Sequence, residues 1–212
     1  MFLDFGACVN AALDGKAFRG EEFRNLLHSL EDAGLGQIAN DYLHEIQQLE
    51  LMRPVAFRDQ MQSEITVCYR ENVVRMNLTF LAMLSLEYQS IDECFKATHP
   101  DDDLNLLFRI VMQCQIIDDV FDYSRDARQR LPGFLTASAG LGESFDMTWD
   151  AANRYASGYS CSKISNLFPL QVALFIVSAS AKTVIAMGRW RQRAKIAKMT
   201  NHKLPVPSTE PL

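Results

Sequence analysis

The sequence predicts an all-α fold: a single domain of about seven or eight antiparallel helices around a central apolar cavity. Its 212 residues suffice for one well-buried domain. Apolar residues recur at helical spacing along most of the chain, and no alternating strand pattern with a hairpin turn occurs. We expect the domain to cover residues 1–200, followed by a disordered, proline-rich tail at residues 201–212.

Composition and charge exclude several classes of protein. The chain is 48% hydrophobic and 22% charged, which is typical of a globular domain. A net charge of −5 provides no positive field for a phosphate backbone, so we expect no nucleic-acid partner. The five cysteines lack Cys-x-x-Cys spacing, and no basic segment followed by an apolar run opens the chain. We therefore expect reduced thiols and a cytoplasmic location.

The N-terminal part is predicted to form three helices. Residues 2–14 form a short one, on which Asn10 and Asp14 share a face at i,i+4 spacing. Residues 21–33 and 37–51 each carry an apolar stripe and end at helix breakers. Because the chain begins inside an amphipathic pattern, we expect that the bundle lacks some N-terminal helices.

A long helical pattern follows from residue 57 to residue 97, with no Gly or Pro to interrupt it. Within it, Asn72, Arg75 and Thr79 follow i, i+3, i+7 spacing and so share one face. Arg75 is expected either to line a cavity and meet its ligand, or to pair with Glu71 on the surface.

The most informative stretch is acidic and reads Gln115-Ile-Ile-Asp118-Asp119-Val-Phe-Asp122-Tyr-Ser-Arg-Asp126. In a helix, its four aspartates and its glutamine share an arc of about 100°. Like charges at i,i+4 spacing are unfavourable unless a cation meets them. Oxygen ligands of this kind suit Mg²⁺, which binds one or two carboxylates, waters and substrate phosphates. The stretch therefore predicts a metal site, with a solvated acidic helix face as the alternative.

Basic residues follow the acidic stretch in the longest predicted loop. Arg128 and Arg130 stand just beyond Asp126, where they are expected either to clamp a phosphate or to remain solvated. Loops of this length often act as functional lids.

Two further helices are predicted at residues 143–157 and 163–198. The run from 164 to 187 carries only one charge, but its Ser, Thr, Gln and Pro content argues against a membrane span. We expect instead a helix buried at the centre of the bundle. The basic cluster at residues 189–198 suits the helix C-terminus. It is also suited to holding a diphosphate or to peripheral contact with an anionic membrane.

Residues 114–126 closely resemble the second aspartate-rich motif of class I isoprenoid synthases, the superfamily of trans-prenyltransferases, squalene/phytoene synthases and terpene synthases. The shared pattern is Gln-x-x-Asp-Asp-x-x-Asp-x-x-x-Asp, and the match covers about thirteen residues. The resemblance implies a helical bundle whose aspartates face a central cavity and hold a diphosphate through Mg²⁺.

The resemblance also implies roles for individual residues. Its implied metal ligands are Asp118, Asp119, Asp122 and Asp126, of which the first three are the implied catalytic group. The implied substrate is an allylic prenyl diphosphate, ionised to a carbocation before condensation or cyclisation. The side chains expected to contact this substrate or its diphosphate are Gln115, Arg75, Arg128, Arg130, Asn10 and Asp14. Phe80, Tyr88 and Phe108 are expected to shield the cation, and a homodimer is an expected assembly.

The sequence departs from the superfamily pattern in two respects, a reduced first aspartate-rich motif and a chain that is shorter than that of a typical member. The first aspartate-rich motif is reduced to Asn10 and Asp14, whose alternative role is a turn at the end of a helix. Two other functions therefore stay open: a degenerate, non-catalytic partner or regulatory subunit with the same fold, and a helical protein whose acidic strip binds a basic partner.

Overall fold

The structure is a computed structural model that describes residues 1–13, 19–57, 61–84, 103–157 and 168–201. It is 86% helical and contains no strand within these ranges, which confirms the predicted all-α class. The helices are α1 (Phe2–Leu13), α2 (Gly20–Asp32), α3 (Gly36–Leu51), α4 (Met61–Met83), α6 (Asp103–Gln129), α7 (Leu141–Ala156) and α8 (Phe168–Asn201), with a short 3₁₀ turn, η1 (Phe134–Thr136). The predictions for residues 84–97, for Asp14 and Tyr88, and for the tail beyond Asn201 fall wholly or mainly outside the described ranges.

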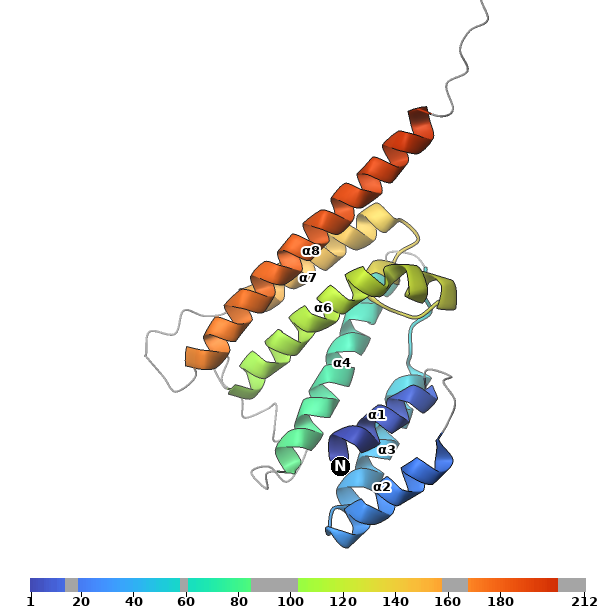
Figure 1. Ribbon diagram of the computed structural model, residues 1–212, viewed down its shortest axis with the longest axis vertical. Coiled ribbons are helices and arrows are strands. Elements are labelled where there is room, and N and C mark those ends of the chain that lie inside the picture. Colours follow the sequence, from blue (N-terminus) through green and yellow to red (C-terminus); the bar gives the residue numbers. More distant parts are fainter. Residues whose placement is uncertain (14–18, 58–60, 85–102, 158–167, 202–212) are drawn as a thin grey trace, which may run out of the picture.

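The helices form two groups that meet at α4 (Figure 1). On one side, α8 packs on α6 and α7, and α6 packs on α4. On the other side, α1, α2 and α3 pack on one another, and α3 lies against α4. Since α4 touches both groups, it is the element through which they are joined.

The sequence of α4 explains how it serves two groups. Val74 and Leu78 belong to the apolar cluster shared with α6, α7 and α8. Met76 and Phe80 belong to the cluster formed with α1, α2 and α3. A helix that is apolar on opposite sides has no single hydrophobic stripe, and such a helix is buried between two layers.

α8 does not occupy the centre of the bundle, so that prediction is wrong. Only 22% of its most apolar window is buried, although its length and composition would allow it to cross a membrane. Its inner side buries Ser178, Ala181 and Ile185 against α6 and α7. Gly188 permits this close approach, because a Cβ there would lie 2.9 Å from the Phe145 ring. The other side of α8 is exposed.

The segment between α6 and α7 is no solvated loop. α6 ends at Gln129, and Arg130, the next residue, adopts a left-handed backbone (φ 54°). The Leu131 N–H donates to the Asp126 carbonyl oxygen at 3.0 Å. The seven residues that follow Leu131 are all buried. Thr136 closes the turn, since its hydroxyl accepts the Gly133 N–H at 2.8 Å and donates to the Leu131 carbonyl oxygen at 2.6 Å. This segment is therefore packed inside the bundle and is not a solvent-exposed loop.

Two buried tyrosines donate hydrogen bonds to glutamates on other helices. Tyr155 on α7 donates to Glu71 on α4 at 2.7 Å, and Tyr69 on α4 donates to Glu50 on α3 at 2.6 Å. Burial, followed by the adjacent carboxylate, raises the pKa of both phenols far above the ordinary value. Both tyrosines therefore stay protonated in the folded protein when free tyrosine would ionise.

We expect the free energy of unfolding to fall as the pH rises above about 10, the pKa of an unfolded tyrosine. Above this pH the unfolded state releases phenolic protons that Tyr69 and Tyr155 retain when folded, so alkali favours unfolding. Tyrosinate absorbance should be lower in the native than in the denatured protein at the same alkaline pH. In Tyr155→Phe, the denatured signal should fall by one tyrosine and the native signal should stay unchanged. A fall in the native signal would contradict the assignment.

Candidate metal and diphosphate site

The acidic stretch is helical, as predicted, and lies on the C-terminal half of α6, but its carboxylates do not share one environment. Asp118 is exposed, Asp122 is half-buried, and Asp119 and Asp126 are buried. Consecutive residues of a helix point about 100° apart, so Asp118 and Asp119 project to different sides of α6. The strip is therefore divided between a surface pair and a buried pair.

Asp119 is held by two other parts of the chain. One carboxylate oxygen accepts from Arg70 Nη2 on α4 at 2.6 Å, and the other accepts the Phe134 N–H of η1 at 2.6 Å. Arg70 Nη1 also donates to Gln115 Oε1 at 3.0 Å. The guanidinium thus joins two polar residues of the motif, four positions apart on α6, and fixes both relative to α4.

Opposing effects act on the Asp119 carboxyl. Burial raises the pKa of Asp119 above its ordinary value, and the carboxylate of Asp126 adds to this rise. The Arg70 guanidinium and the Phe134 N–H oppose it, because both bond to the charged form. An acid in this position is costly to bury, so its two partners are necessary to the fold.

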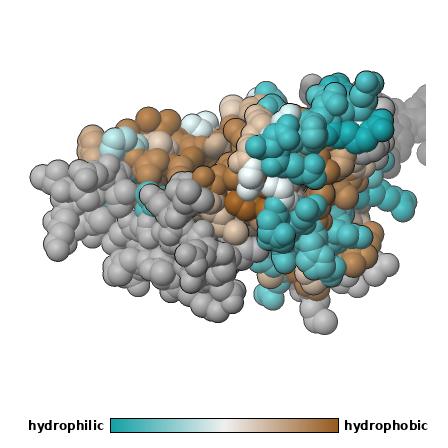
Figure 2. Space-filling model, turned by 90° about the horizontal axis from the view of Figure 1, so that it is seen from below, coloured by the Kyte–Doolittle hydropathy of each residue, from teal (hydrophilic) through white to brown (hydrophobic). Residues whose placement is uncertain are grey.

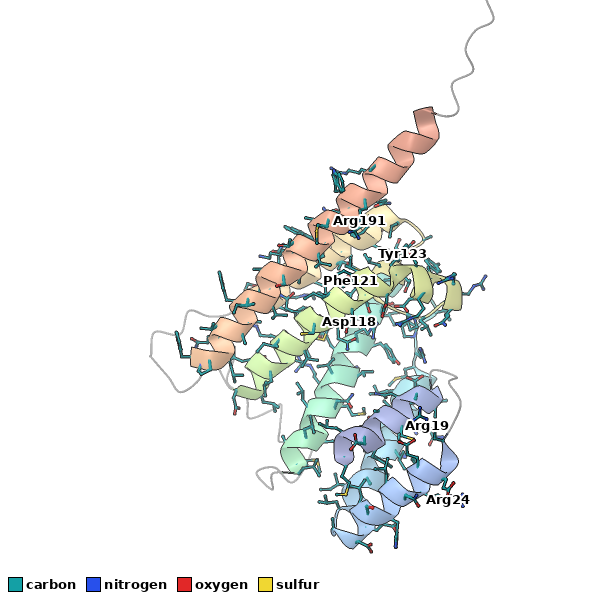
Figure 3. All side chains as sticks on the ribbon, viewed as in Figure 1. Arg19, Arg24, Asp118, Phe121, Tyr123 and Arg191 are labelled. Carbon is teal, nitrogen blue, oxygen red and sulfur yellow. The ribbon has the colours of Figure 1, made fainter. Side chains whose placement is uncertain are left out.

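The other carboxylates have different partners. Arg125 donates to Asp122 at 2.5 Å and to Asp126 at 3.3 Å, and its side chain is half-exposed. Asp118 makes no hydrogen bond or ion pair with any described residue. Figure 3 places it on the stretch of α6 that passes between α4 and α8. Asp118 and Asp122, at i,i+4 spacing, are therefore the two carboxylates accessible to a ligand.

A cavity of about 430 Å³ lies between α1, α3, α4 and α6. The predicted cavity was apolar, but this one also has polar side chains in its lining. The polar lining residues include Asn10 of α1, Arg53 after α3, Arg70 and Asn77 of α4, and Gln115 of α6. Leu78 and Leu81 are part of its apolar wall. A cavity of this size and mixed lining suits a small ligand with a charged head and an apolar tail.

Gln115 connects the cavity to the exposed carboxylates. It lines the cavity, and Asp118 follows it by three residues and Asp122 by seven on the same side of α6. One turn of helix rises about 5.4 Å, so both carboxylates lie within two turns of the cavity wall.

Of the other residues predicted to contact the substrate, Asn10 lines the cavity, whereas Arg75, Arg128 and Arg130 do not. Arg75 lies over the Phe108 ring at 4.2 Å from its centre, in the cluster on the far side of α4. Arg128 donates to the Ser124 carbonyl oxygen at 2.9 Å, and both it and Arg130 are exposed at the end of α6. Asn10 lies at the cavity wall as an exposed residue. The predicted aromatic shield is not formed by Phe80 and Phe108, which are packed in the two apolar clusters.

The residues present fit Mg²⁺ through two carboxylates. No group of three His, Cys, Asp or Glu side chains in the described ranges is arranged to hold a metal. Mg²⁺ commonly uses only one or two carboxylates and takes its other ligands from water and substrate phosphates. Asp118 and Asp122 match this ligand set, whereas both oxygens of Asp119 are already bonded.

Arg70 is the residue of the candidate site that was not predicted from the sequence. The polar strip on α4 was assigned to Asn72, Arg75 and Thr79, yet Arg70 and Asn77 line the cavity. Their spacing of seven residues places both on one face of α4 and was available in the sequence. The contact between the Phe134 N–H and Asp119 left no such signal, since it depends on the path of the chain after α6.

Comparisons of the chain with protein-family models, with curated proteins and with solved structures found no match. Its function is therefore inferred from the chemistry of the site and from the motif at residues 115–126.

Asp119→Ala should destabilise the protein by about 3 kcal/mol, because it leaves the Arg70 charge and the Phe134 N–H without their acceptor. Asp118→Ala, on the same helix but exposed, should change stability by less than about 0.5 kcal/mol. Denaturant unfolding measures both. Combining Asp119→Ala with Arg70→Leu should recover part of the loss, and a purely additive double variant would contradict a direct ion pair.

Gly133→Ala should also destabilise the protein, by about 1–3 kcal/mol. A Cβ at residue 133 would lie 2.7 Å from Asp119 Oδ2 and 3.4 Å from Arg70 Nη2. Gly142→Ala in α7 is the matched control, since nothing lies within 4 Å of its Cβ position. This control should be neutral or stabilising by up to about 1 kcal/mol, because Ala favours helix. Equal effects of the two substitutions in thermal or denaturant unfolding would contradict the packing at Gly133.

Proposed function

We propose that the chain binds the Mg²⁺ complex of an allylic prenyl diphosphate and acts on it as a class I isoprenoid synthase. The observation that carries the proposal is the continuity along one side of α6, from Gln115 in the cavity wall to the accessible carboxylates of Asp118 and Asp122. The resemblance of residues 114–126 to the superfamily motif supports the same chemistry.

Asp118 and Asp122 would hold the metal, which when bound supplies charge neutralisation to the diphosphate leaving group. Arg125, now paired with Asp122, is half-exposed and free to turn toward solvent as the metal enters. Gln115 is fixed by Arg70 and would orient a water or a diphosphate oxygen at the cavity wall. Asp119 acts as a positioning residue in this proposal, since it holds Arg70 in place.

Arg70 adds a second feature that favours an anionic ligand. Its Nε–H is buried and has no acceptor among the described residues. A buried donor without an acceptor costs about 1–3 kcal/mol. The Arg70 side chain as a whole is 22% exposed and lines the cavity, where its charge would attract a diphosphate. Leu78 and Leu81 offer apolar contact to the prenyl chain in the same cavity.

A second candidate is a member of the fold that binds the diphosphate without ionising it. It is favoured by the wall of the cavity opposite α6, where the described lining offers no accessible carboxylate. Glu50 is the only acidic side chain of the described cavity lining, and Tyr69 and Arg53 already bond both of its oxygens. Asn10 of α1, to which the described part of the first aspartate-rich motif is reduced, also lines the cavity and carries no charge. Binding without turnover is the expected behaviour of such a site.

With Mg²⁺ and a non-hydrolysable prenyl thiodiphosphate at one hundred times the dissociation constant, we expect stabilisation of about 2.7 kcal/mol. Asp118→Asn and Asp122→Asn should each abolish most of this thermal shift. Asp32→Asn, an exposed carboxylate on α2, is the control and should keep it. An absent shift in the unmodified protein would overturn the proposal.

Turnover is tested separately by incubation with C10, C15 and C20 allylic diphosphates and Mg²⁺, with products identified by mass spectrometry. An isoprenoid synthase releases diphosphate and yields a condensed or cyclised product, and Asp118→Asn should lower its rate by at least about 100-fold. A Mg²⁺-dependent thermal shift without any product would identify the non-catalytic member instead.

A further inference from the structure

The outer side of α8 exposes a series of large apolar side chains that the site does not use. Its exposed apolar side chains include Phe168, Val172, Phe175, Ile176, Met187 and Trp190. At about 100° per residue these six positions fall within an arc of about 120°, so they form one stripe. Seen from the α2 and α3 end, the described surface is hydrophilic over these helices, and apolar residues gather toward the side where α8 lies (Figure 2).

The stripe is free of charge over its whole length. Every exposed residue from Phe168 to Trp190 is uncharged, because Lys182 is half-buried and Arg189 is turned toward α7. At 1.5 Å per residue the stripe extends about 33 Å. Exposed Ser180 and Thr183 lie between Ile176 and Met187, so the large apolar side chains form two groups along the stripe. Exposed apolar side chains gathered on one side of a helix mark an interaction site.

Charge decides which partner fits the stripe. α8 carries six of the 21 Lys and Arg residues of the chain and none of its 26 Asp and Glu residues. The whole chain has a net charge of −5, so the remainder carries −5 − 6 = −11. Arg191 and Arg193 are exposed directly after Trp190 (Arg191 is labelled in Figure 3). A second copy of α8 offers this cluster no acidic partner, whereas anionic lipid headgroups do.

We propose that the α8 stripe attaches the protein to the surface of an anionic lipid bilayer. Phe175 and Ile176 enter the boundary between headgroups and acyl chains, Trp190 lies at the headgroup level, and Arg191 and Arg193 contact the anionic headgroups. The proposal does not depend on the proposed function, because none of these residues lines the cavity.

The inner side of α8 favours attachment along the surface over insertion across the bilayer. Gln113 of α6 donates to Ser178 of α8 at 3.1 Å and to the Ala152 carbonyl oxygen of α7 at 2.8 Å. Arg189 donates to the Phe145 carbonyl oxygen at 2.6 Å and to Asp146 at 2.7 Å. Withdrawal of α8 into the bilayer would break these contacts, whereas attachment by its outer side keeps them.

Co-sedimentation of the full chain with phosphatidylcholine vesicles, with and without phosphatidylserine, tests the proposal. We expect binding that requires phosphatidylserine and is reversed by high salt. Arg191→Gln combined with Arg193→Gln should weaken binding by about 30-fold, since each cation near an anionic surface contributes about 1 kcal/mol. Arg19→Gln, just before α2, combined with Arg24→Gln on α2 is the matched control, since both residues lie away from Arg191 in Figure 3; it should leave binding unchanged.

A second pair of variants tests the apolar stripe. Phe175→Glu should abolish vesicle binding, and Leu51→Glu, at a residue of similar exposure on α3, should not. In a Trp149→Phe background, the emission of Trp190 should move to shorter wavelength when vesicles are added. Binding that survives Phe175→Glu, or that resists high salt, would overturn surface attachment by α8. The proposal also fails if the chain ignores vesicles and instead shows a concentration-dependent dimer that Phe175→Glu abolishes.

Discussion

The buried carboxylate of Asp119 is the interaction on which most of the structure around the site depends. It accepts from Arg70 on α4 and from the Phe134 N–H of η1, and so connects two helices and the buried segment after α6. Each partner satisfies one oxygen of an acid that would otherwise be expensive to bury. The same Arg70 sets the position of Gln115, and with it one wall of the cavity.

The carboxylates of the motif therefore differ in burial and in their partners. The buried members stabilise the fold around α6, and the accessible pair of Asp118 and Asp122 is left for a ligand. The division follows from the helix itself, because adjacent aspartates point about 100° apart and cannot both face the same partner. A motif that looks uniform in the sequence therefore contains two kinds of residue in the structure.

The sequence predicted the helical class and most helix boundaries because these depend on local periodicity, and it predicted that the acidic residues share α6. It could not predict which aspartate turns inward, since the partners of Asp119 lie 49 and 15 residues away along the chain. The predicted position of α8, at the centre of the bundle, was wrong for a similar reason. Its apolar content indicates that it avoids water, but composition cannot tell a central helix from an outer helix with one exposed apolar side.

The position of α4 between two apolar clusters has a consequence for how the chain unfolds. Val74 and Leu78 face one cluster while Met76 and Phe80 face the other, all within two turns of the same helix. If either group of helices unfolds, the apolar side chains on one side of α4 become exposed. The two clusters therefore form a single cooperative unit. We therefore expect amides in the middle of α4 to open only with the whole molecule and to exchange more slowly than those of the longer α8.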